Sequence, residues 1–148
     1  MVVVVDVQSF KTSKKCFSPK ELAIYNGKQM AHFVFKPPFP WSSLDNEFQR
    51  QANWVTHNHH GIKWESGHTP SHLFPLILRH LISPSDHVYV KGKEKADIIR
   101  KALSRDVIEV EEEPALPSLE PNCYYHIRSP CHCALSNVYY IYNTYVMQ

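Results

Sequence analysis

The sequence contains no hydrophobic run long enough to cross a membrane. None of its apolar stretches approaches the roughly 18 residues that a transmembrane helix requires. The apolar start, Met-Val-Val-Val-Val, lacks a basic segment and a small-residue cleavage site, so it does not resemble a signal peptide. We therefore expect no membrane association, and we predict a cytoplasmic or nuclear protein.

The net charge is also small. The chain carries 16 Lys and Arg against 14 Asp and Glu, a formal charge of +2, which does not predict nucleic-acid or membrane binding by charge alone. There is no internal repeat and no low-complexity segment. The 43% of apolar and 20% of charged residues are ordinary for a globular protein. A length of 148 residues suits one domain, so we predict a single domain over residues 1–148.

Only four cysteines are present, and three of them lie close together near the C-terminus. In a secreted protein four cysteines would suggest two disulfides, whereas in a reducing compartment clustered Cys and His more often bind metal or stay as thiols. Zinc favours four tetrahedral N, S or O ligands. Cys123-x2-His126 followed by Cys133 therefore suggests three ligands of a zinc site. The spacing leaves the fourth ligand open: it comes from elsewhere, or from Cys131 or His132.

Hydrophobic patterning predicts five strands and four helices. The valine-rich run at residues 2–7 is typical of a strand buried on both faces, and the Asn26-Gly27 turn predicts a hairpin between the next two strands. A helix between the last two strands predicts that they are parallel. The expected strands are 2–7, 21–25, 31–35, 87–92 and 106–110, and the expected helices run from Ser42 or Ser43 to 58, from Thr69-Pro70 to 81, over 94–103 and over 133–145.

These elements predict an α/β fold. Its sheet has five strands, three antiparallel and then two parallel, and helices flank both faces. This order of elements is that of an RNase H-like domain, and the fold name is an analogy drawn from the order alone.

The C-terminal cluster resembles a known family. The run Cys123-Tyr-Tyr-His126-Ile-Arg-Ser-Pro-Cys-His-Cys133-Ala-Leu is similar to the Cys-x2-His-x6-Cys-Ala-Leu segment of the Maelstrom domain. That domain descends from the DEDDh 3′–5′ exonucleases and has an RNase H-like fold with a Glu-Cys-His-Cys zinc site. Further upstream, Glu21-Leu-Ala-Ile-Tyr resembles the strand that carries the zinc-binding glutamate, and His60-Gly-Ile-Lys resembles the family's middle segment.

The resemblance implies a specific set of zinc ligands. They are Glu21, Cys123, His126 and Cys133, while Cys131 and His132 would not bind the ion. Four protein ligands leave no open position for water, so the implied zinc is structural. The implied setting is RNA silencing.

A nuclease centre is expected to be incomplete. The DEDDh enzymes bind two magnesium ions through an Asp-x-Glu pair and two later aspartates, and a histidine activates the attacking water. Here Asp6 is retained, but Gln8 replaces the glutamate, and His132 is followed by Asn137 in place of an aspartate. Neutral amides are poor magnesium ligands. Magnesium or manganese is therefore expected only for a divergent nuclease that uses Asp6 and His132.

A basic stretch follows the fourth predicted strand. Lys91, Lys93 and Lys95 either form a solvated helix face or contact phosphates. We expect a zinc-stabilised, exonuclease-derived module that lacks two-metal catalysis and binds RNA or a protein partner in silencing. The alternatives are a divergent nuclease acting on single-stranded RNA or DNA, and an interaction scaffold that uses residues 37–41 for docking.

Overall fold

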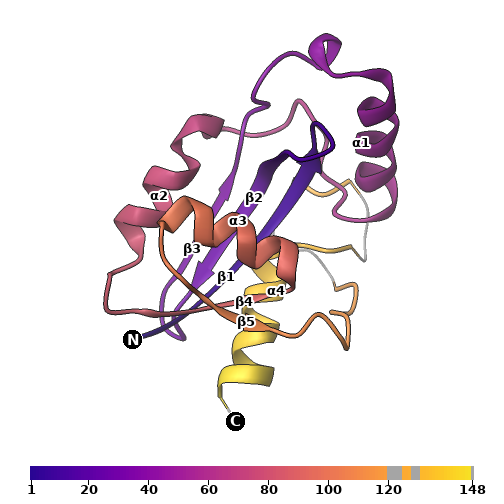
Figure 1. Ribbon diagram of the computed structural model, residues 1–148. Coiled ribbons are helices and arrows are strands. Elements are labelled where there is room, and N and C mark those ends of the chain that lie inside the picture. The colour runs from indigo at the N-terminus through magenta and orange to yellow at the C-terminus, as the bar shows by residue number, and fades with distance from the viewer. Residues whose placement is uncertain (120–124, 128–130, 148) are drawn as a thin grey trace.

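The protein folds as a five-stranded mixed sheet with helices on both faces (Figure 1). The structure is a computed structural model, and it describes residues 1–119, 125–127 and 131–147. The strands are β1 (Val2–Lys11), β2 (Phe17–Tyr25), β3 (Met30–Val34), β4 (His87–Lys91) and β5 (Ile108–Val110). The helices are α1 (Asn46–Asn58), α2 (Phe74–Leu81), α3 (Lys93–Leu103) and α4 (Ala134–Ile141).

The strand order in the sheet is β3-β2-β1-β4-β5. β1 pairs antiparallel with β2, and β2 pairs antiparallel with β3, as the Asn26-Gly27 turn predicts. β4 runs parallel to both β1 and β5. The predicted sheet of three antiparallel and two parallel strands is therefore confirmed. Among the helices in the described part of the chain, none combines the length and apolar character that crossing a bilayer requires.

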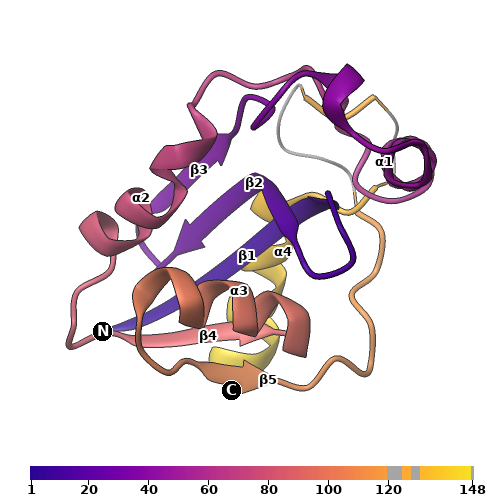
Figure 2. The ribbon, with the colours of Figure 1, turned by 45° about the horizontal axis from the view of Figure 1, so that its top comes forward.

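The two faces of the sheet carry different layers (Figure 2). On one face, alternate residues of β1 pack against α2 and α3 in the largest core cluster, whose members include Val3, Val5, Val7, Leu78 and Ile99. On the other face, Val4 and Ala23 pack against α4. Side chains alternate along a strand, so Asp6 and Gln8 of β1 lie on the α4 face with Val4.

The same alternation places Glu21 of β2 on the α4 face, because Glu21 is two residues from Ala23. Gln8 is directly opposite Glu21 in the sheet, and Asp6 is opposite Ala23. Three buried polar side chains, those of Asp6, Gln8 and Glu21, are thus gathered under the beginning of α4.

A register shift next to this cluster buries a lysine. Gln8 pairs with Glu21 but Ser9 pairs with Pro19, so the pairing skips Lys20. The Lys20 side chain is only 3% exposed, and its Nζ donates to the carbonyls of Phe35 (2.8 Å), Trp64 (2.6 Å) and Ser66. Burial lowers the pKa of Lys20 to about 8. This ammonium ties β2 to the loop that follows α1.

Replacing Lys20 should therefore destabilise the fold. In Lys20→Met the carbonyls of Phe35 and Trp64 lose a charged donor, and leaving buried acceptors unpaired costs about 1–3 kcal/mol. We expect a loss of about 2 kcal/mol in the free energy of unfolding, measured by urea titration. Lys28→Met is the matched control, because Lys28 is exposed. Equal stability of the two variants would contradict this role for Lys20.

Several boundaries differ from the predicted ones for local reasons. A separate 3-10 turn takes up Ser42 and Ser43, so α1 begins after Asp45 instead of after either serine. Thr69 does not cap a helix, because its carbonyl accepts from the amide of Lys36 (2.7 Å), and α2 begins only at Phe74. The last helix changes to a π-helical turn at Tyr142–Val146.

Four strands also differ in length from the prediction. β1 continues to Lys11 instead of ending at residue 7, and β4 ends one residue early, at Lys91. β2 begins at Phe17, earlier than predicted, because the pairing with β1 continues beyond the register shift through Pro19, Ser18 and Phe17. β5 begins at Ile108 instead of residue 106. The Asp106 carboxylate binds Arg100 (2.7 Å) and the amide of Val107 (2.9 Å), which holds this residue outside the strand.

Candidate metal centre and the neighbouring cleft

Three of the four predicted zinc ligands come together in the core. One ligand atom each from Glu21, His126 and Cys133 lies within 4.8 Å of the other two. Glu21 comes from β2, His126 from the segment that pairs with Ile62, and Cys133 immediately precedes α4. The fourth predicted ligand, Cys123, lies outside the described residues. A buried Glu-His-Cys group that could hold a metal ion thus joins the sheet to the C-terminal segment.

Glu21 is the centre of this group. Its side chain is fully buried, and Oε2 lies 3.1 Å from Nε2 of His126 and 3.5 Å from Sγ of Cys133. Oε1 accepts a hydrogen bond from the backbone amide of Ala134 (2.7 Å) in the first turn of α4. Oε1 therefore binds helix α4, and Oε2 faces His126 and Cys133.

His126 is oriented by the backbone on its far side. Its Nδ1 donates to the carbonyl of His60, which turns Nε2 toward Glu21. This hydrogen bond is the type that fixes the tautomer of metal-binding histidines. His60 is itself fully buried, and its Nδ1 accepts from the amide of Ile62 (3.0 Å). Burial lowers the pKa of His60 to about 3, so its ring is neutral.

In the metal-free group, Glu21 and His126 form a buried ion pair. Burial alone would raise the pKa of Glu21, but the hydrogen bonds from His126, His32 and Ala134 outweigh burial and lower it. For His126, burial lowers the pKa, and contact with Cys133 and Glu21 raises it well above its usual range. Glu21 is therefore a carboxylate, and the His126 imidazolium is its buried positive partner when no metal is bound.

The donor set fits a zinc ion. Zn–N and Zn–O bonds of ~2.0–2.2 Å and Zn–S bonds of ~2.3 Å place two ligands of a tetrahedron about 3.5 Å apart. The distances from Glu21 to His126 (3.1 Å) and to Cys133 (3.5 Å) are close to that separation. Cys131 is also buried, but its backbone pairs with Leu119 (3.0 Å) and it is not one of the three converging residues.

His32 contributes to this centre, and the sequence did not indicate it. Its Nε2 donates to Oε2 of Glu21 at 2.8 Å from the neighbouring strand β3. His32 is opposite Ala23, two residues beyond Glu21 along β2, so its ring lies on the same face of the sheet. The only sequence signal was a histidine within an alternating strand, a pattern that surface histidines share.

Known proteins offer no assignment for this chain. No family model, no curated protein and no solved structure matches it.

A second buried polar cluster surrounds Asp6. The Asp6 side chain is fully buried, and its Oδ1 accepts from Nζ of Lys95 on α3 at 2.9 Å. Its Oδ2 accepts from Nδ2 of Asn137 on α4 (2.9 Å) and more distantly from Nε2 of Gln8 (3.5 Å). A lysine ammonium and two amides thus surround the carboxylate.

A cleft of about 340 Å³ opens beside this cluster. The predicted catalytic residue His132 lines it together with Gln8, Lys95 and Asn137. The His132 ring stacks on that of His59, with centroids 4.2 Å apart and planes at 25°. The structure therefore brings His132 and the Asp6 cluster to one cleft, although these residues are far apart in the sequence.

The three lysines predicted for phosphate contact have different environments. Lys91 is 5% exposed, and its Nζ donates to the carbonyls of Glu111 (2.5 Å) and Glu112 (3.0 Å). Lys91 is therefore a buried structural residue and does not present its charge to solvent. Lys95 is bound to Asp6 with 28% of its side chain exposed, and of the three lysines only Lys93 is in the exposed class.

Proposed function

We propose that this chain is a zinc-stabilised RNase H-like module, similar to the Maelstrom domain, that binds single-stranded RNA and does not carry out two-metal catalysis. One observation carries the proposal. The Asp6 carboxylate, which would have to bind magnesium in a nuclease, is already neutralised by the ammonium of Lys95 at 2.9 Å.

The neighbours of Asp6 support the same conclusion. Two-metal catalysis needs several carboxylates around the ions, whereas here Gln8 and Asn137 direct amide nitrogens at Asp6. A magnesium ion would have to displace Lys95 and would gain only neutral oxygens from these amides. Magnesium prefers carboxylates and phosphates as ligands, so the exchange is unfavourable.

Zinc and the RNase H-like assignment are supported by separate features. The Glu-His-Cys group supplies the O, N and S ligands that zinc accepts, and a fourth protein ligand from Cys123 would make the site structural. The antiparallel β1-β2-β3 meander followed by parallel β4 and β5 agrees with the element order of an RNase H-like domain. At the cleft, the partly exposed Lys95 and the histidine pair offer donors for phosphate and ribose oxygens.

The proposal predicts binding without cleavage. We expect the purified protein to bind a labelled single-stranded RNA at low salt, with an affinity that falls as salt is raised. We expect no shortening of that RNA on addition of magnesium or manganese. Fluorescence anisotropy measures the binding, and denaturing gel electrophoresis measures the length of the RNA.

Asp6→Asn provides the control for catalysis. This variant keeps the size of the side chain and removes the charge that a metal would need. Cleavage that requires magnesium or manganese and disappears in Asp6→Asn would overturn the proposal in favour of a divergent nuclease. Absence of RNA binding at low salt would overturn its RNA-binding part.

A further inference from the structure

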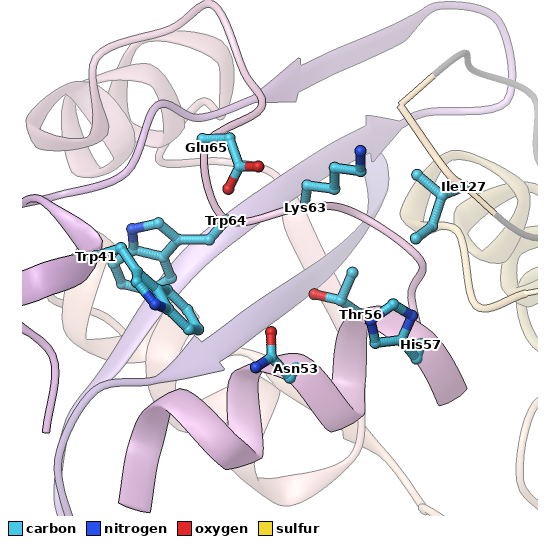
Figure 3. Close-up of a pocket in the computed structure, with 8 residues that line it drawn as sticks. All are labelled: Trp41, Asn53, Thr56, His57, Lys63, Trp64, Glu65 and Ile127. Carbon is cyan, nitrogen blue, oxygen red and sulfur yellow. The ribbon is translucent and has the colours of Figure 1, made fainter. Parts of the chain in front are cut away.

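A second cavity lies between α1 and the segment at residues 63–65 (Figure 3). It has a volume of about 360 Å³ and shares no lining residue with the cleft beside Asp6. Helix α1 forms one wall, and residues 63–65 form another. Ile127 closes one end, and its backbone amide donates to the carbonyl of Gly61 (2.6 Å). The cavity is thus bounded by three neighbouring segments between residues 41 and 65 and by the distant Ile127.

Two indole rings form the apolar end of the cavity. Figure 3 shows Trp41 and Trp64 side by side there, and their ring centroids are 5.7 Å apart at an angle of 68°. Trp64 is 4% exposed and is held by the rings of Phe10 (5.3 Å) and Phe39 (5.6 Å). Trp41 is only half-buried. A rigid aromatic surface therefore faces a space that a flat ring can enter.

Polar groups without partners surround that space. Asn53 and Lys63 are exposed, and neither side chain forms a hydrogen bond or an ion pair with any described residue. The cavity thus offers donors and an amide acceptor beside an aromatic wall.

We infer that this cavity binds one nucleobase of a single-stranded RNA. Stacking on aromatic side chains is the common way in which proteins hold unpaired bases. An Asn amide matches the paired donors and acceptors of a base edge. Lys63 lies at the rim, where it can contact the attached phosphate. Glu65 shares that rim, and its charge opposes a second phosphate inside the cavity. The base therefore enters, and the backbone stays outside.

This inference rests on the RNA-binding part of the proposed function, but it assigns the base to a site separate from the cleft. The test uses the full chain and a labelled oligouridylate, with Trp41→Leu and Asn53→Ala as site variants. Trp54→Leu and Gln51→Ala are the matched controls. Trp54 and Gln51 are exposed residues of α1, the helix that carries Asn53, and neither lines the cavity. Asn53 is exposed, so Asn53→Ala leaves the core intact.

We expect each site variant to weaken oligouridylate binding by about tenfold, and each control to bind like the wild type. Uridine monophosphate should quench the tryptophan fluorescence of the wild type, and ribose 5-phosphate should not. Quenching by both compounds would indicate a phosphate site and overturn the inference. Unchanged oligouridylate affinity in both site variants would overturn the inference and leave the proposed function standing. Absence of binding to the wild type would overturn both.

Discussion

Glu21→Gln and Cys133→Ser are expected to lose the bound metal and most of the stability of the fold. Structural zinc contributes directly to folding, with apparent binding free energies of about 10–16 kcal/mol in small zinc domains. The apolar cores on both faces of the sheet also stabilise this chain, so we expect a smaller effect than in those domains. The free energy of unfolding should fall by at least about 4 kcal/mol, which is what a ligand contributes at a thousand times its Kd. A chelator should have the same effect on the wild type.

The expected loss follows from the position of the ligands. Glu21 joins the centre from β2, and Cys133 joins it from the residue before α4, 112 positions later in the chain. Oε1 of Glu21 also binds the first turn of α4 through the amide of Ala134. Without the ion, these buried polar side chains would lose the cation that joins them. The C-terminal segment would then be held to the sheet by the apolar contacts and hydrogen bonds of α4.

The measurement combines metal content with thermal unfolding. We expect about one zinc per wild-type chain and nearly none in Glu21→Gln or Cys133→Ser. Two exposed residues, Cys16 and Glu65, supply the matched controls Cys16→Ser and Glu65→Gln. Cys131→Ala should retain zinc but lose some packing, because Cys131 is fully buried. Full zinc content in both site variants would contradict the predicted ligand set.

Lys95→Met is expected to cost about 3 kcal/mol in the free energy of unfolding. Removal of one partner from a buried ion pair leaves an uncompensated charge, which typically costs 3–5 kcal/mol. We expect the lower end of that range, because Asn137 still donates to Asp6 and 28% of the Lys95 side chain is exposed. Lys93→Met is the control, because Lys93 is an exposed lysine on the same helix.

A double-mutant cycle separates the ion pair from other effects of the substitution. In Lys95→Met combined with Asp6→Asn, the buried charge is gone, so most of the lost stability should return. Urea titration of the four proteins gives the coupling energy between the two side chains. If Lys95→Met is as stable as Lys93→Met, within about 0.5 kcal/mol, the ion pair does not stabilise the fold in the way that we describe.

Local sequence patterns predicted the elements of the fold well. The continuous apolar run of β1, the Asn26-Gly27 turn and the periodicity of α3 each reflect contacts within a few residues. These patterns are sufficient to predict the order of strands and helices, and hence the mixed sheet. They failed at boundaries where a distant group intervenes, as at Thr69, whose carbonyl accepts from the amide of Lys36.

The metal centre was predicted in part for a similar reason. Cys133 and His126 are near each other in the sequence, so their spacing was informative. Glu21 was suggested only by resemblance, since nothing in its own segment distinguishes a ligand from an ordinary strand residue. His32 could not be found, because its contact with Glu21 depends on the pairing of β2 with β3.

The sequence by itself determined which residues the protein has for chemistry: an incomplete set of acids at Asp6, Gln8 and Asn137, and a cluster of zinc-type ligands. Only the tertiary structure decided what these residues do. The register between β1 and β2 places Asp6 and Glu21 on one face under α4. The packing of α3 on the sheet then brings Lys95 to Asp6 across 89 positions. Strand register and helix packing depend on contacts distant in the chain, and local spacing does not encode them.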